Sequence, residues 1–315
     1  MQVWRDNSLV PDDLGRTVVT IGNFDGMHLG HQHVVRRAGE VAAEVGVDHV
    51  VAVTFDPHPI AVLRPEHAPP TLTTIDERLR LLGDAGVDDV LVVPFSREIA
   101  GWTPEEFIDR ILVEALHARA VVVGANFRFG NRARGDIHTL REAGETHDFV
   151  VEAVELDGGP QVWSSTYVRT CLAAGDVAGA AEALGRPFCT RGVVMEGDKR
   201  GRELGYPTAN VPVAPGAAAP ADGVYAGRLR ILSGPEAGSD LPAAISVGTN
   251  PTFAGERERR VEAYVLDRTD LELYGVEVEV TFVDRVRGMV RFDSVDDLLV
   301  AMADDVVRTR EILGA

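Results

Sequence analysis

The sequence predicts an α/β amino-terminal half followed by an all-β carboxy-terminal half that ends in a helix. In the first half, runs rich in Val and Ile alternate with helix-like segments, a pattern typical of a parallel sheet covered on both faces. After Arg186 and Pro187 the segments become short strands divided by Gly, Pro and Asp, which indicates a small antiparallel barrel or sandwich. We therefore expect two domains, at 1–186 and 187–315.

The first half contains five predicted strands separated by helices. The strands are expected at 17–24, 49–55, 87–95, 118–127 and 149–156, and the helices at 31–46, 73–86 and 103–117. Thr74 is expected to be the N-cap of the second of these helices, because a hydroxyl oxygen accepts from free backbone N–H groups. Gly46 is expected to end the first helix. Two short helices then follow within 164–185.

The second half predicts strands at 188–197, 223–232, 241–248, 259–267 and 276–288. The tail, at 294–313, has apolar residues at helical spacing and predicts an amphipathic helix packed on these strands.

Composition restricts the class of partner. Of 315 residues, 49 are acidic and 31 are Lys or Arg, so the formal net charge is −18 and the surface should repel nucleic acid and anionic membranes. The two cysteines, Cys171 and Cys189, form no CxxC motif and predict reduced thiols. We find no signal-peptide pattern and no stretch of membrane-spanning length, so a cytoplasmic protein is expected.

Residues 25–31 follow the first predicted strand, where ligands bind in open α/β sheets. Gly26 and Gly30 allow a ligand to approach the backbone, and the next helix begins near Gly30 with free N–H groups that favour an anion. His28 and His31, three residues apart, can point the same way. This pattern indicates a donor cluster for a phosphate that gains charge in a transition state.

Two other interpretations of this loop stay open on the residues alone. His28, His31 and His33 could bind zinc, although neither a cysteine nor an obvious acidic ligand completes the set. The loop could also be a purely structural turn.

Several motifs resemble a known family. "GNFDGMHLGH" (22–31) is similar to the HxGH signature of nucleotidyltransferases, and "TFDPHP" (54–59), "VGANFRFG" (123–130) and "SSTYVR" (164–169) follow in the order seen in bacterial bifunctional riboflavin kinase/FMN adenylyltransferases, or FAD synthetases. "GDKRGRELGYPTAN" (197–210), "VGTNPTF" (247–253), "RRVEAYVLD" (259–267) and "LYG" (273–275) resemble the kinase half. The resemblance covers almost the whole chain and implies a Rossmann-like nucleotidyltransferase domain before a barrel of riboflavin kinase type.

In the first domain, the resemblance implies that His28 and His31 bind ATP phosphates and stabilise adenylyl transfer. It also implies a set of further ATP- or flavin-binding residues: Gly22, Phe24, Asp25, Gly30, His58, Asn126, Ser165, Thr166 and Arg169.

In the second domain, the resemblance implies that Glu262 is the base that deprotonates the ribityl hydroxyl. Thr208 and Asn210 would bind Mg²⁺ beside ATP, an ion that prefers few protein oxygens plus substrate oxygens. Gly197, Lys199 and Gly205 are expected to contact ATP. From the residues alone, "YPTAN" could be a turn that enters a strand, and Glu262 a solvent-facing carboxylate.

These expectations predict an enzyme of flavin cofactor synthesis. The second domain would convert riboflavin and ATP to FMN and ADP, and the first would convert FMN and ATP to FAD and pyrophosphate. Mg²⁺, ATP and flavins are the expected small molecules, with no nucleic-acid or membrane partner, and the oligomeric state is left open. An enzyme with one active site, or a flavin-binding regulatory protein, is less favoured because His28, His31 and Glu262 are all present.

Overall fold

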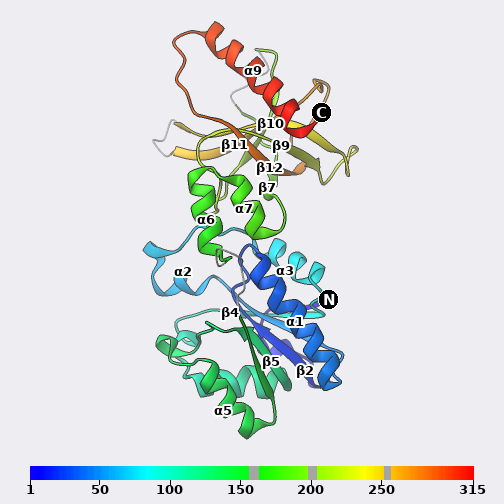
Figure 1. Ribbon diagram of the computed structural model, residues 1–315, viewed down its shortest axis with the longest axis vertical. Coiled ribbons are helices and arrows are strands. Elements are labelled where there is room, and N and C mark those ends of the chain that lie inside the picture. The colour runs from blue at the N-terminus through cyan, green and yellow to red at the C-terminus, as the bar shows by residue number, and fades with distance from the viewer. Residues whose placement is uncertain (156–162, 198–203, 252–256) are drawn as a thin grey trace. The chain divides into compact units, whose positions relative to one another are not determined.

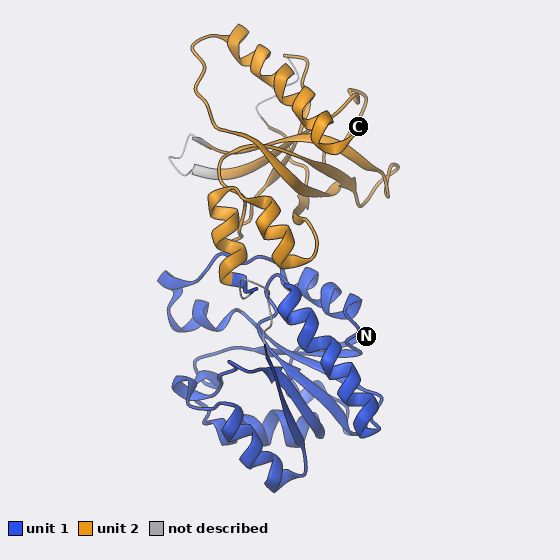
Figure 2. Ribbon diagram, viewed as in Figure 1, with its two compact units in different colours: residues 1–165 blue, residues 166–315 orange. Residues whose placement is uncertain are grey.

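The computed structural model describes residues 1–155, 163–197, 204–251 and 257–315 (Figure 1). The chain forms two compact units, Met1–Ser165 and Thr166–Ala315 (Figure 2). Within the described residues, every helix is too short or too polar to cross a bilayer.

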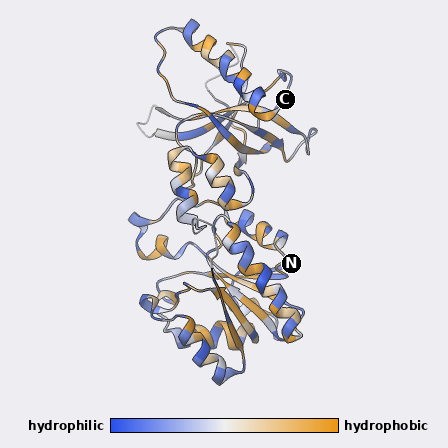
Figure 3. Cartoon of the chain, in the orientation of Figure 1, coloured by the Kyte–Doolittle hydropathy of each residue, from blue (hydrophilic) through white to orange (hydrophobic). Residues whose placement is uncertain are grey.

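The first unit is built on a six-stranded parallel sheet in the order β1-β4-β3-β2-β5-β6. Its strands are β1 (Gln2–Trp4), β2 (Thr17–Ile21), β3 (Val50–Asp56), β4 (Asp89–Pro94), β5 (Ala118–Gly124) and β6 (Val150–Val154). The central strands are almost entirely buried and are drawn as hydrophobic in Figure 3, as expected for a parallel sheet covered on both faces.

Helices cover both faces of this sheet. The longer ones are α1 (Leu29–Val45), α3 (Ile75–Asp84) and α5 (Ile137–His147), and short ones are α2 (Pro59–Leu63), α4 (Pro104–Phe107) and η4 (Ile108–Ala115), which winds as a π-helix. Single 3₁₀ turns are η1 (Asn7–Leu9), η2 (Pro65–His67), η3 (Ile99–Gly101) and η5 (Asn131–Ala133).

Alternate residues of β2 face the two layers. Val18 packs in the cluster beneath α1, whereas Val19 and Ile21 pack in the cluster beneath η4 and α5. Packing on both faces therefore fixes the position of β2, and with it the position of the loop that follows its carboxyl end.

The second unit starts at Thr166, within α6 (Ser165–Ala174), and includes α7 (Val177–Leu184). It continues as an antiparallel sheet in the order β7-β12-β9-β10-β11-β8. Its strands are β7 (Phe188–Val193), β8 (Thr208–Pro212), β9 (Gly223–Ile231), β10 (Asp240–Pro251), β11 (Arg257–Val265) and β12 (Glu277–Gly288). The edge strands β7 and β8 meet at Gly192, where an added Cβ would contact Val211, so the sheet curls into a barrel. Helix α9 (Val295–Leu313) packs on β9, β10 and β12.

The predicted fold class is confirmed, as are the caps: Thr74 accepts from Glu77 N, and Gly46 ends α1 in the left-handed conformation. Helices α6 and α7, which the predicted boundary at 186/187 assigns to the first domain, contact the barrel. Ala221 N donates to Leu172 O at 2.8 Å, and α7 packs on β7 and β12.

Candidate functional site

The loop between β2 and α1 has an unusual backbone. Phe24 and Met27 have φ values of +49° and +42°, and Gly26 has +84°. Bulky residues rarely adopt positive φ, and such strain persists where surrounding packing fixes it, most often at ligand sites. Both side chains are buried in the core beneath α1 and α3, which holds the loop in this shape.

His28 and His31 lie together at the start of α1. His28 is the N-cap, its Nδ1 accepts from His31 N at 3.4 Å, and the two rings stack with centroids 3.6 Å apart. A Cβ at Gly30 would lie 3.1 Å from the His28 ring, so glycine leaves room for this ring. The predicted pairing of the two histidines at a helix N-terminus is thus present in the first unit.

The same geometry argues against a shared metal ion. The planes of the two rings are inclined by only 25°, so their in-plane lone pairs run side by side rather than converge. Burial, and then the charges of His28 and Arg78, hold the pKa of His31 well below its usual range. Its buried Nδ1 has no hydrogen-bond partner among the described residues. His31 therefore presents a neutral imidazole.

Asp25 links this loop to the segment before α3. Its carboxylate is 1% exposed and accepts from Leu72 N at 3.0 Å, Thr73 N at 3.0 Å and Thr73 Oγ1 at 3.1 Å. The Asp25 carbonyl oxygen accepts from Ser165 Oγ at 2.8 Å. These contacts of the Asp25 side chain are internal to the protein, and its direct contact with a ligand stays a prediction.

Replacing Asp25 with alanine should destabilise the first unit by about 3–5 kcal/mol, because buried N–H donors lose their acceptor and the buried Arg78 loses its nearest negative charge. All three tryptophans (Trp4, Trp102 and Trp163) belong to this unit, so tryptophan fluorescence during urea unfolding reports on it alone. Asp84→Ala, at a carboxylate that is exposed, is the control and should change stability by less than about 0.5 kcal/mol. Equal effects of the two substitutions would contradict this role.

Other predicted residues of the first site lie on several elements. Gly22 N donates to Val53 O at 3.0 Å, His58 Nδ1 caps α2 by accepting from Ile60 N at 3.1 Å, and Asn126 is exposed in the turn after β5. Thr166 and Arg169 stand on α6 in the second unit. Their contacts with ATP or flavin stay predictions.

The second unit contains a cavity of about 330 Å³. Thr208 and Glu262, two residues predicted for the kinase site, both line it. Polar lining residues include Ser246, Arg287 and Asp305, and the rest of the wall is largely apolar, with residues Leu204, Tyr206, Val224, Ala244, Tyr264, Met289, Val290, Phe292, Leu298, Met302 and Val306. A mostly apolar cavity with few polar groups suits an aromatic ligand that carries a polar tail.

Strand register places the polar residues on one face. Glu262 lies opposite Asn210 on β8 and Ser246 on β10, and Tyr264 lies opposite Thr208. Directly opposed residues project to the same face, as do residues two apart, so Thr208, Asn210 and Glu262 share one face. The buried residues between them, such as Ala209 and Val261, fill the other.

The glycines near this face have separate structural reasons. A Cβ at Gly197 would overlap the Asn210 amide, so a larger residue there would displace the Asn210 side chain. Gly205 has a φ of +85°, which favours glycine in the turn before β8. Lys199 lies outside the described residues.

The sequence analysis did not predict a partly buried ion pair in the cavity wall or a buried arginine in the first unit. Arg287 binds the Asp305 carboxylate through Nε at 2.8 Å and Nη2 at 2.7 Å, joining β12 to α9. Arg78 lies on the buried face of α3 with Leu82. The position of Arg78 within the apolar stripe of its helix could have predicted that this arginine is buried. No such pattern in the sequence predicts the position of Arg287.

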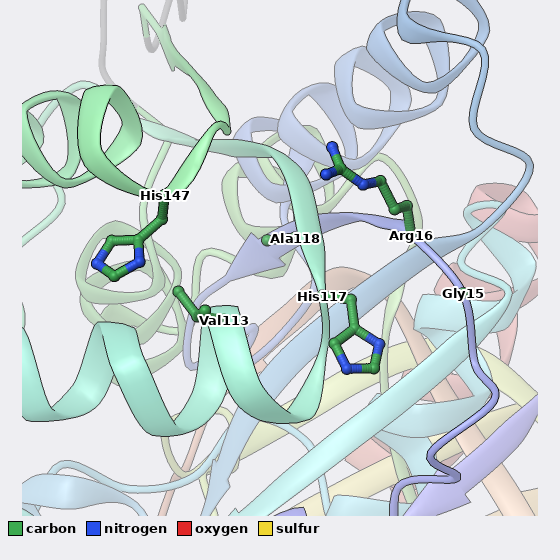
Figure 4. A pocket seen from close by; sticks show the side chains of 6 residues that line it. All are labelled: Gly15, Arg16, Val113, His117, Ala118 and His147. Atoms are coloured by element: carbon green, nitrogen blue, oxygen red, sulfur yellow. The ribbon is translucent and has the colours of Figure 1, made fainter.

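A further cavity, of about 370 Å³, lies at the opposite end of the parallel sheet from His28 and His31. It is lined by Arg16 before β2 and by His117 before β5, with His147 at the end of α5. These side chains point in different directions (Figure 4), and Arg16 is paired with Asp148 at 3.3 Å. Ligands of such sheets bind at the carboxyl ends of strands, whereas this cavity lies at their amino ends.

Comparison with known proteins gives matches over both units. The family model described as FAD synthetase matches residues 10–166, and that described as riboflavin kinase matches residues 184–313. The bifunctional riboflavin kinase/FMN adenylyltransferase of Escherichia coli K12 is 38% identical over 94% of this chain and 93% of its own length. The protein of that name from Pseudomonas fluorescens is 38% identical over 97% and 96%.

Among solved structures, a crystal structure named as a macrolide-efflux protein from Streptococcus pneumoniae is 32% identical, with a TM-score of 0.87 over 98% of both chains. The likeness in sequence and fold thus extends over both units. The stacked histidines after β2 and the cavity that contains Thr208 and Glu262 lie within the two matched regions. This chain belongs to the family of bifunctional riboflavin kinase/FMN adenylyltransferases.

Proposed function

We infer that this chain makes FAD in two steps, phosphorylating riboflavin in the barrel and adenylylating FMN in the α/β unit. The observation that carries the inference is that each matched region has its own set of polar residues, His28 with His31 and Thr208 with Glu262. Full-length relatives at 38% identity bear the name of both activities. ATP, riboflavin and FMN are the small molecules this function requires.

In the kinase step, Glu262 takes the proton of the ribityl 5′-hydroxyl as that oxygen attacks the γ-phosphorus of ATP, and ADP leaves. The half-buried position of Glu262 beside the apolar wall supports this role. The flavin ring system would occupy the apolar part of the cavity, which would keep water away from the transferred phosphoryl group.

Thr208 and Asn210 have side chains that suit Mg²⁺, because both offer neutral oxygens from one face of β8 and leave the other coordination positions to ATP and water. When bound, the ion would neutralise charge on the phosphates. Asn210→Ala should raise the Mg²⁺ concentration needed for half-maximal FMN formation about 10- to 100-fold. EDTA should stop the reaction and added Mg²⁺ restore it; an unchanged Mg²⁺ requirement would remove Asn210 from the site.

In the adenylylation step, a phosphate oxygen of FMN attacks the α-phosphorus of ATP and pyrophosphate leaves. His28, His31 and the free N–H groups that open α1 would bind the phosphates and stabilise the charge that develops on them. Gly22, Phe24, Asp25 and Gly30 shape the loop that presents these groups. His58, Asn126, Ser165, Thr166 and Arg169 would complete the binding of ATP or flavin.

The remaining proposals concern organisation. The functional domains divide near residues 186 and 187, as the start of the match to the riboflavin kinase model near residue 184 supports. A cytoplasmic enzyme is proposed, since ATP and both flavin substrates are cytoplasmic metabolites.

Labelled ATP distinguishes the two reactions. With riboflavin and γ-³²P-ATP, the label should appear in FMN; with FMN and α-³²P-ATP, it should appear in FAD, while unlabelled pyrophosphate is released. Absence of label from either flavin would remove the corresponding activity from the proposal.

A further inference from the structure

Arg78 is a buried cation that the two-step mechanism does not use. The residue is 4% exposed on α3, and its Nη1 donates to Phe55 O at 3.1 Å and to Thr54 Oγ1 at 3.4 Å. Its Nη2 lies 3.9 Å from Asp25 Oδ1. Burying a guanidinium lowers the stability of the folded protein unless its charge is well paired, so a poorly paired one indicates a functional role.

The charge of Arg78 is only partly compensated. The Asp25 carboxylate already accepts from Leu72 and Thr73, and 3.9 Å is too long for a hydrogen bond to Arg78. Buried Nε of Arg78 has no hydrogen-bond partner among the described residues. Desolvation lowers the pKa of Arg78, although Asp25 and then Asp56 oppose this effect. The group nevertheless stays charged, because an arginine pKa begins far above neutrality.

Arg78 joins segments that meet at the carboxyl edge of the sheet. It contacts the end of β3 through Thr54 and Phe55, and it faces the Asp25 loop that leads to His28. Thr54 Oγ1 in turn donates to Asn23 O at 3.2 Å, within the same loop. The charge of Arg78 also acts on His31, whose protonation it opposes.

We propose that Arg78 is a positioning residue for adenylyl transfer: it fixes the loop from Asn23 to His31 and adds a buried positive charge beneath the site of the ATP phosphates. This inference rests on the proposed FMN adenylylation. The triphosphate of ATP would bind near a neutral His31 and the fixed positive charge of Arg78. Such an arrangement attracts the phosphates without a rearrangement of protein groups.

The test compares Arg78→Met and Arg78→Lys with wild type in FMN adenylylation. Arg78→Met should lower kcat about 100-fold, as expected when a supporting contact is lost and the loop shifts. It should also raise KM for ATP and raise the pKa of His31, measured by NMR titration of labelled histidine, although burial and His28 still hold that pKa below its usual range. Arg78→Lys, which keeps the charge, should retain the low pKa of His31 and lose less kcat.

The controls separate a local effect from unfolding and from failure of the proposed function. Arg16→Met removes an exposed arginine at the other end of the sheet and should leave kcat and KM unchanged. Tryptophan fluorescence checks that the first unit is folded, and riboflavin phosphorylation in the same preparation checks the second.

Wild-type kinetics in folded Arg78→Met would overturn the inference. So would equal losses in Arg78→Met and Arg78→Lys with an unchanged His31 titration, because that result means a merely structural role. If wild type itself makes no FAD from FMN, the proposed adenylylation fails instead.

Discussion

His31→Ala is expected to lower FAD formation from FMN by about 100- to 1,000-fold, the cost of losing one preorganised group at a charged transition state. The same variant should convert riboflavin to FMN at the wild-type rate, since Glu262 and Thr208 belong to the other unit. FMN should therefore accumulate. Chromatography of the flavins, with each substrate supplied separately, measures both rates.

His33→Ala is the matched control for this substitution. His33 stands two residues further along α1, so it projects from a different face of the helix. FAD formation should be unaffected by it. If His31→Ala retained full adenylylation, or if both histidine variants lost it equally, the stacked pair His28–His31 would not be the adenylylation site.

Glu262→Gln is expected to lower riboflavin phosphorylation about 100- to 10,000-fold, because the amide keeps the size of the side chain and cannot accept the hydroxyl proton. FMN supplied directly should still become FAD. Glu277→Gln, at an exposed glutamate that begins β12, is the control and should leave both steps unchanged.

The dependence on pH sharpens this test. If Glu262 is the base, the residual rate of Glu262→Gln should lose the acidic limb that its ionisation gives to the wild-type profile. A Glu262→Gln enzyme with wild-type kinase activity would show that another group takes the proton.

Local pattern was enough to predict most of the fold. Buried strands such as β3 and β5 are continuous apolar runs, and α3 has both a hydroxyl cap and apolar spacing. The missed elements lack such signals: β1 is three residues long, and β8 has proline on both sides of Thr208–Val211. Helix α5 carries only two buried residues, and the predicted helix at 103–117 changes to π-helical geometry at Ile108.

Only those parts of the candidate sites that lie within one sequence motif could be predicted. The spacing of His28 and His31 was enough to predict that they lie together, because both belong to one helix start. By contrast, the contact of Asp25 with Leu72 and the pairing of Arg287 with Asp305 join segments that are distant in the sequence. The spacing of these residues does not predict either contact. Strand register places Glu262 opposite Asn210, and Glu262 lines the cavity, while its role as the base stays a prediction.

The central claim, that one chain makes FAD from riboflavin, is tested most directly by incubating the purified protein with riboflavin, ATP and Mg²⁺ and following the flavins by chromatography over time. The account predicts that FMN appears first and that FAD then forms at its expense. Riboflavin that stays unchanged, together with added FMN that also stays unchanged, would contradict it.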